Sequence, residues 1–200
     1  MEIETGRYSG PATTLFFYTR EFLVECPKCQ HLAVVTTNRS RDTSQDQVSC
    51  SHCNHTEKAD DRIRYTATVK WACDHCNESL GFTIPNNKEK VEELTVSCPH
   101  CGTATTLKPK NESSRLFYKN SGPGDPVFNL PLWFQTDIKG NLFWAFNREH
   151  LIEIRNYVTA KLRERQTTTH TTMVEKLPQF IKAAKNREVI LKAIEKLMRK

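Results

Sequence analysis

CPKC at residues 26–29, CSHC at 50–53, CDHC at 73–76 and CPHC at 98–101 contain all eight cysteines of this 200-residue chain. Twenty residues separate the first segment from the second, and 21 separate the third from the fourth. A shift of 47 or 48 positions places the first two segments on the last two. The chain therefore carries an internal repeat of one four-cysteine unit, and no cysteine is left over.

The spacing within each segment is typical of a metal site. Two residues between cysteines let one tight turn direct both thiolates at a single ion, and a second such turn completes a tetrahedron. Asn or Gly follows three of the turns and tolerates the left-handed backbone that a tight turn often demands. The residues in this position are Gln30, Asn54, Asn77 and Gly102. β-branched residues shortly before the turns predict strands that lead into them, namely Val24, Val48, Val69 and Val96.

We predict two zinc ions per chain, each held by four thiolates. Consecutive turns are expected to share an ion, because a repeat normally copies a self-sufficient unit. The predicted ligands are Cys26, Cys29, Cys50 and Cys53 for one ion, and Cys73, Cys76, Cys98 and Cys101 for the other. The alternative is a cross-braced arrangement, which pairs the first turn with the third and the second with the fourth.

Two further alternatives concern the metal and its ligands. Iron fits the same four-thiolate geometry as zinc. Histidines in or beside the turns are alternative ligands, namely His31, His52, His55, His75 and His100. Four thiolates already complete the coordination of a structural zinc ion and leave no position for a catalytic water. We therefore interpret the histidines as solvent-facing turn residues.

The start of the chain bears on the redox state of the cysteines. The sequence MEIETGRYSG lacks the apolar segment of a secretory signal, and no transmembrane stretch follows. We therefore expect a soluble cytoplasmic protein, in a reducing compartment that keeps thiols available for metal. Four disulfides in a secreted scaffold are the weaker interpretation.

Charge is distributed unevenly along the chain. Residues 1–112 carry 13 Lys and Arg against 15 Asp and Glu, whereas residues 113–200 carry 16 against 8. The formal net charge is +6. A zinc ion with four thiolates contributes about −2, so two such sites reduce the net charge to roughly +2. The molecule is expected to have an acidic metal-binding half and a basic C-terminal half.

The pattern of elements predicts an α+β protein, with two tandem small β zinc ribbons followed by a β-hairpin and a helical C-terminal domain. Ribbon 1 with its N-terminal strands is assigned to 1–62 and ribbon 2 to 63–108. A linker rich in Pro, Gly, Ser and Asn occupies 109–126, and the aromatic hairpin and basic helical domain occupies 127–200. Residues 13–25 are interpreted as strand leading into the first site.

The C-terminal domain shows clear helix signals. Two aromatic-rich runs within 127–147 flank a glycine-containing turn and predict the hairpin. Asn147 is the expected N-cap of a helix at 148–165, where apolar residues recur at helical spacing. Shorter helices are expected after Pro178 and after Asn186.

Two groups of residues are candidates for contact with a partner. The aromatic cluster of the hairpin is mainly expected to be core, but Trp133 and Trp144 are candidates for exposure or for stacking on unpaired bases. The basic C-terminal segment is of a kind that attracts phosphate backbones, although an ordinary solvated face is an equal alternative. Its candidate contact residues are Lys182, Lys185, Arg187, Lys192, Lys196 and Arg199.

The cysteine segments, CPKC…CSHC and CDHC…CPHCG, resemble zinc ribbons of the transcription factor IIB type, as found in many bacterial proteins. The resemblance covers about residues 20–108. It implies rubredoxin-like knuckles, zinc held by four cysteines, and docking on nucleic acid, polymerase or another large assembly. This chain departs from the pattern because only its last turn has the CxxCG glycine and because its ribbons are acidic.

No catalytic constellation is evident in the sequence, which lacks HExxH, GxSxG and a glycine-rich phosphate loop. We therefore expect a non-enzymatic zinc-binding adaptor, with no small-molecule substrate and no membrane association. The first hypothesis is association with nucleic acid or a nucleoprotein complex through the basic C-terminal helices. The alternative is a protein partner that docks on the acidic ribbons and the aromatic hairpin.

Overall fold

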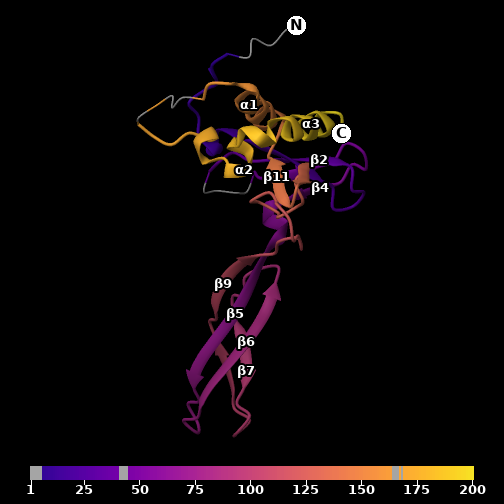
Figure 1. Ribbon diagram of the computed structural model, residues 1–200. Helices are drawn as coiled ribbons and strands as arrows, with labels where there is room; N and C mark the ends of the chain where they lie inside the picture. Colours follow the sequence, from indigo (N-terminus) through magenta and orange to yellow (C-terminus); the bar gives the residue numbers. More distant parts are fainter. Residues whose placement is uncertain (1–5, 41–44, 164–166, 168) are drawn as a thin grey trace. The chain divides into compact units, whose positions relative to one another are not determined.

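The computed structural model describes residues 6–40, 45–163, 167 and 169–200. The chain divides into two compact units, a larger one of Met1–Ala59 and Tyr118–Lys200 and a smaller one of Asp60–Phe117 (Figure 1). Each unit contains one complete cysteine quartet. Small antiparallel sheets combined with a few helices confirm the predicted α+β class.

The first ribbon is a four-stranded antiparallel sheet in the larger unit, in the order β1-β2-β3-β4. Its strands are β1 (Glu21–Glu25), β2 (Leu32–Thr36), β3 (Gln47–Ser49) and β4 (Thr56–Lys58). The two middle strands pair at Val34↔Ser49, Val35↔Val48 and Thr36↔Gln47. Side chains on one face alternate into the core, as the period of a strand requires.

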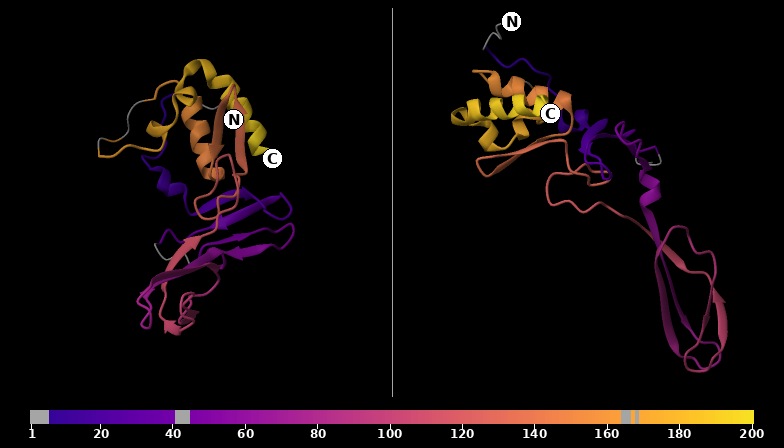
Figure 2. Two further views of the ribbon diagram at one scale, coloured as in Figure 1. Left: turned by 90° about the horizontal axis from the view of Figure 1, so that it is seen from below. Right: turned by 90° about the vertical axis from the view of Figure 1, so that its right-hand side faces the viewer.

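The C-terminal part of the larger unit is the predicted hairpin with helices packed against it. Strands β10 (Phe134–Ile138) and β11 (Asn141–Ala145) pair around Lys139 and Gly140, both of which have a positive φ. Helices α1 (Arg148–Thr159) and α3 (Arg187–Met198) lie side by side and contact the hairpin (Figure 2). Short helices precede α3, namely η3 (Val174–Lys176), α2 (Gln179–Lys182) and η4 (Ala184–Asn186).

Helix α1 ends earlier than predicted. Asn147 is the N-cap as expected, and its side chain accepts a 3.0 Å hydrogen bond from the His150 amide. The helix stops at Thr159 because Ala160 adopts an extended backbone. The guanidinium of Arg187 donates 3.0 Å and 3.2 Å hydrogen bonds to the carbonyls of Val158 and Ala160, which satisfies acceptors at the helix end. Residues 164–166 lie outside the described residues.

Residues 13–25 are only partly a strand. Leu15–Tyr18 form the 3-10 helix η1, and β1 begins at Glu21. Within η1, Tyr18 is buried, whereas Phe16 and Phe17 are 60% and 51% exposed. This aromatic run therefore lacks the alternation of burial that a half-buried strand shows.

The core of the larger unit consists of two clusters of buried side chains. One cluster lies between the hairpin and the helices and includes Phe134, Phe143, Leu151, Ile154, Ile190 and Ile194. The other joins the first ribbon to the chain after Tyr118, and it includes Phe22, Val24, Val35, Phe128, Leu130 and Leu132. The first ribbon therefore shares its core with residues that follow the second ribbon in sequence.

This shared core changes the domain organisation expected from the sequence. An antiparallel bridge joins Val24 to Leu132, and the amide of Glu25 donates a 2.9 Å hydrogen bond to the carbonyl of Pro131. Ribbon 1 and the C-terminal region thus form one compact unit rather than two domains. The residues assigned to a linker also differ, because Lys110–Arg115 form strand β9.

The smaller unit contains the second ribbon. A three-stranded sheet has the order β6-β5-β9, and the hairpin β7–β8 forms a separate two-stranded sheet (Figure 1). The strands are β5 (Ile63–Ala72), β6 (Ser79–Asn87), β7 (Leu94–Ser97), β8 (Ala104–Leu107) and β9. Strand β5 pairs with β6 on one side and with β9 on the other. The 3-10 helix η2 (Ala59–Arg62) precedes β5.

Candidate metal centres

The first cysteine quartet is arranged as a tetrahedral metal site requires. Cys26 Sγ lies 3.7 Å from Cys53 Sγ, and Cys29 Sγ lies 3.6 Å from Cys50 Sγ. All four sulfur atoms lie within 4.8 Å of one another. A tetrahedron with Zn–S bonds of about 2.3 Å has sulfur–sulfur edges of about 3.8 Å. The quartet therefore fits a zinc ion held by four thiolates, and its sulfurs are too far apart for disulfides.

The second quartet reproduces this geometry. Cys73 Sγ lies 3.6 Å from Cys101 Sγ, and Cys76 Sγ lies 3.7 Å from Cys98 Sγ. These four sulfur atoms also lie within 4.8 Å of one another. The pairing of consecutive cysteine segments is confirmed, and the cross-braced alternative is wrong. Two such sites support zinc binding; the identity of the metal stays a prediction.

The backbone of every turn is organised in the same way. The amide of the first cysteine in each segment donates to the carbonyl five residues later, at 2.8 or 2.9 Å. These donor–acceptor pairs are Cys26–His31, Cys50–His55, Cys73–Glu78 and Cys98–Thr103. Each bond closes a knuckle that starts and ends on adjacent strands. The strands therefore position the sulfurs of each pair, and a metal ion would join two such turns.

The residues after the turns adopt the left-handed backbone that the sequence suggested. Their φ angles are 62° at Gln30, 58° at Asn54, 58° at Asn77 and 76° at Gly102. Such a φ is strained for most side chains, and Asn and Gly accept it at the lowest cost. Only the first knuckle uses a residue, Gln30, that lacks this advantage.

Burial differs systematically within each cysteine pair. The first cysteine of each segment is buried, whereas the second is half-buried or exposed. Thr103 lies beside the second site, with its hydroxyl 3.4 Å from Cys101 Sγ, and hydrogen bonding by Thr103 lowers the pKa of the Cys101 thiol to about 5. In the first site, backbone hydrogen bonds from Cys53 and then His52 lower the pKa of Cys50 to about 7. In the same quartets, backbone hydrogen bonds are outweighed by burial and the neighbouring sulfurs, which raise the pKa of Cys29 and Cys76 to about 12. Without metal, the thiolate form is therefore favoured at only part of each quartet.

Two of the histidines cluster at the first site. The rings of His31 and His52 stack with centroids 3.5 Å apart, and both are exposed. Their nitrogens lie close to Cys29 Sγ, so these three residues form a further possible group of ligands. Because Cys29 already belongs to the quartet, this group is not independent of the first site.

The predicted basic contact residues fall into two classes. Lys182 donates to the carbonyl of Glu175, and Arg187 caps α1, so both cations make structural contacts within the larger unit. The other four are exposed, namely Lys185, Lys192, Lys196 and Arg199. Glu188 and Glu195 are exposed on α3 among these cations, so the basic face is interrupted by negative charge.

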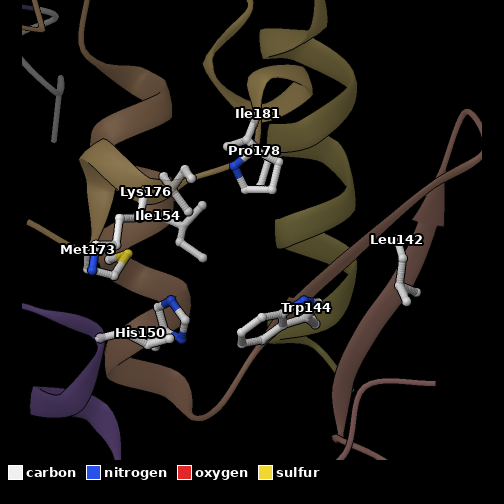
Figure 3. Close-up of a pocket in the computed structure, with 10 residues that line it drawn as sticks. Leu142, Trp144, His150, Ile154, Met173, Lys176, Pro178 and Ile181 are labelled. Atoms are coloured by element: carbon white, nitrogen blue, oxygen red, sulfur yellow. The ribbon is translucent and has the colours of Figure 1, made fainter.

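The two candidate tryptophans are less exposed than a stacking platform requires. Lys200 Nζ lies 4.0 Å from the centroid of the Trp133 ring in a cation–π contact. Trp144 lines a mainly apolar cavity of about 110 Å³, beside His150 (Figure 3). The His150 Nδ1 accepts a 3.2 Å hydrogen bond from the Phe146 amide, and burial lowers the pKa of His150 to about 4. These rings therefore contribute to the packing of the larger unit.

Sequence reasoning missed the apolar side chains of the second ribbon. Trp71, Leu80, Phe82 and Ile84 line one groove together with residues of β7. Alternation of Leu80, Phe82 and Ile84 in a nine-residue strand was the signal that could have found them. This groove lies entirely within the smaller unit.

Comparison of this chain with protein-family models, with curated proteins and with solved structures finds no match. Within the described parts of the chain, no helix combines the length and apolar character needed to cross a membrane. The two cysteine quartets and the surfaces around them therefore carry the functional argument.

Proposed function

We propose that this protein is a non-enzymatic adaptor, held in shape by two structural zinc ions, that docks on a protein partner through its smaller unit. Four thiolates saturate a tetrahedral zinc ion, so each site supplies folding energy rather than a position for a reacting water. This proposal places the function on the surfaces of the ribbons.

The observation that carries the proposal is a groove on the smaller unit that apolar side chains line, namely Trp71, Leu80, Phe82 and Ile84. Both core clusters of the described residues lie in the larger unit. In the smaller unit, Phe82 is 47% exposed and Phe117 is 53% exposed, while Trp71 and Ile84 are half-buried. Apolar surface that a small metal-supported fold leaves open is typical of a protein-interaction site.

Nucleic-acid contact is the second candidate. The exposed cations Lys185, Lys192, Lys196 and Arg199 favour it. Glu188 and Glu195 on the same helix weaken the local positive potential, and Lys182 and Arg187 are engaged in structural hydrogen bonds. For this reason we place protein docking first.

The two candidates make different predictions for the chain purified from its native host. A protein partner should survive nuclease treatment, and it should be lost from a C73S/C76S variant, which removes two ligands of the second site. A nucleic-acid contact should instead be lost on nuclease treatment, and a K192E/K196E variant should abolish it. It should also weaken steeply with salt. Partner retention by C73S/C76S together with loss in K192E/K196E would contradict docking through the smaller unit.

A further inference from the structure

The internal repeat predicts the same strand pairs in both ribbons, but among the described strands one of these pairs is present only in the first. In the first ribbon, β2 pairs with β3. The counterparts in the second ribbon, β6 and β7, belong to different sheets. The shift of 47 or 48 residues that superposes the cysteines would place Phe82 opposite Val96, as Val35 lies opposite Val48 in the first ribbon. The smaller unit thus leaves β6 as an edge strand.

The unpaired main-chain groups of this edge can be identified from the ladder. Because the Cys73 amide donates to Glu78, and hydrogen-bonded positions alternate in an antiparallel pair, the even-numbered residues of β6 bond to β5. The amides and carbonyls of Gly81 and Thr83 therefore point away from β5. Exposed groups of this kind are a template for an added strand.

A mainly apolar groove of about 580 Å³ lies beside this edge. It is lined by side chains from β5, β6 and β7, including Trp71, Leu80, Phe82, Ile84, Leu94 and Val96. The three β6 residues among them share one face of the strand. An extended chain alongside β6 would place every second side chain toward the same groove.

Trp71 also lines the groove, but its indole N–H lies below the surface. Trp71 Nε1 is buried and, among the residues described by the structure, has no hydrogen-bond acceptor. Buried indole N–H groups usually find one. Because Nε1 is closed to solvent, the part of the Trp71 ring that lines the groove offers a bound chain apolar contact rather than this donor.

The two edges of the three-stranded sheet are chemically different. Strand β9 carries Lys110, Glu112 and Arg115, which are charges of the sort that protect an edge from pairing. All nine residues of β6 are uncharged. Pro85 blocks pairing only at the far end of β6, so the edge beside Gly81 and Thr83, next to the apolar groove, is the unprotected part of the sheet.

We propose that the β6 edge and its groove bind an extended peptide segment of another protein, with aromatic or branched aliphatic side chains at alternate positions. The peptide adds a strand beside Gly81 and Thr83, and its alternate side chains fill the groove against the Trp71 ring. This inference rests on the proposed adaptor function and names the surface and the partner chemistry.

The test uses octapeptides from a display library, selected on the zinc-loaded full chain and then synthesised with a fluorescent label. Thr83→Pro removes an outward amide at the β6 edge and leaves the main-chain hydrogen bonds between β5 and β6 in place, since proline is tolerated at an edge. It also removes the 3.3 Å hydroxyl contact between Thr83 and Thr68, so Thr83→Val, which lacks the hydroxyl but keeps the amide, is tested beside it and should bind as the unmodified chain does. Ser113→Pro is the matched control, because the β5–β9 register places the Ser113 amide on the outer edge of the same sheet. We expect T83P to weaken binding by about tenfold or more and S113P to leave it unchanged.

A second pair of variants tests the groove without introducing proline, so the test remains valid if a proline variant misfolds. Phe82→Thr removes a groove side chain while retaining strand propensity, and Phe117→Thr removes a similarly exposed ring that does not line the groove. Binding should fall in F82T and persist in F117T. In a ¹⁵N spectrum, peptide should shift the Trp71 indole signal and leave those of Trp133 and Trp144 in place.

Several results would overturn the inference. These are selected peptides without an alternating apolar pattern, equal binding by T83P and S113P, or an unmoved Trp71 indole signal. Concentration-dependent dimerisation lost in T83P would assign the edge to a second copy instead. Nuclear Overhauser contacts between the backbones of Phe82 and Val96 in the zinc-loaded chain would show that β6 is already paired. If peptides fail but native partners still require an intact second site, the groove is wrong and the adaptor function stands.

Discussion

The two ribbons have nearly the same cysteine geometry and very different surroundings. In the first ribbon, Phe22, Val24 and Val35 are fully buried against Phe128 and other residues of the C-terminal region. The second ribbon contributes to neither core cluster of the described residues. One metal motif therefore serves as part of a larger core in the first case and as the main support of a small unit in the second. The difference accounts for the apolar groove of the second ribbon, although exposed rings such as Phe16 and Phe17 also occur in the larger unit.

Loss of metal should have the most different consequences in the two ribbons. We expect Cys98→Ser to abolish ordered structure throughout the smaller unit, because a structural zinc ion contributes about 10–16 kcal/mol to a small metal-dependent fold. Cys50→Ser should loosen the first site but leave the helices and hairpin of the larger unit protected. Amide hydrogen exchange resolved by residue distinguishes the two variants. Equal protection of residues 60–117 in both variants would contradict the account.

Truncation of an aromatic ring should cost the larger unit more stability than the smaller one, because among the described residues only the larger unit has a packed core around such rings. Phe128 is 0% exposed and belongs to the core shared with the first ribbon. Phe128→Ala should destabilise the larger unit by about 3–5 kcal/mol. The matched change Phe82→Ala, at a 47% exposed ring, should cost the smaller unit less than about 1 kcal/mol. Denaturant titrations followed by residue-specific NMR signals measure both changes in the free energy of unfolding. Similar changes in the two units would contradict the difference in packing.

Acid should act on the larger unit through His150. Burial lowers the pKa of His150 to about 4, below the value of about 6.5 in an unfolded chain, so the folded state holds the ring neutral. The associated stability is fully present above about pH 6.5 and is lost as the pH falls toward 4, to a limit of roughly 3 kcal/mol. Urea unfolding of the helices at pH 7 and pH 5 tests this. His150→Gln should flatten the dependence, whereas His170→Gln, at an exposed ring, should not.

The smallest expected effects are changes in stability at the left-handed residues of the knuckles. Gly102 has a φ of 76°, and the space a Cβ would occupy is open, so Gly102→Ala should cost about 1 kcal/mol through backbone strain alone. Gln30 already tolerates a φ of 62° in the first knuckle, so Gln30→Gly should change stability by only a few tenths of a kcal/mol. Zinc-competition titrations of the two sites read out these costs. A larger effect at Gln30 would show that the side chain itself matters there.

The metal centres could be predicted from the sequence because the residues that specify each turn lie close together in the chain. The spacing of cysteines, the left-handed position after each turn and the valines before it all lie within a few residues of one another. Pairing of consecutive turns followed from the repeat. The capping of α1 by Asn147 was equally local and was predicted.

The features that the sequence did not reveal depend on distant contacts. Union of the first ribbon with the C-terminal region depends on pairs such as Val24 and Leu132, which are separated by the whole second ribbon. Residues 110–115 have a polar, linker-like composition, yet they form β9 because the outer edge of β5 is available for pairing. The carbonyls at the early end of α1 are capped by Arg187, which belongs to another helix. Local patterns do not carry such information.

Native mass spectrometry of the zinc-loaded chain tests the central claim most directly. The account predicts two zinc ions per chain, and one ion in each of C50S and C98S, because the two quartets are separate and self-sufficient. It also predicts that C98S keeps the ion of the first site and that the larger unit of this variant stays folded. A single ion in the unmodified chain, or loss of both ions from either variant, would contradict two independent zinc ribbons.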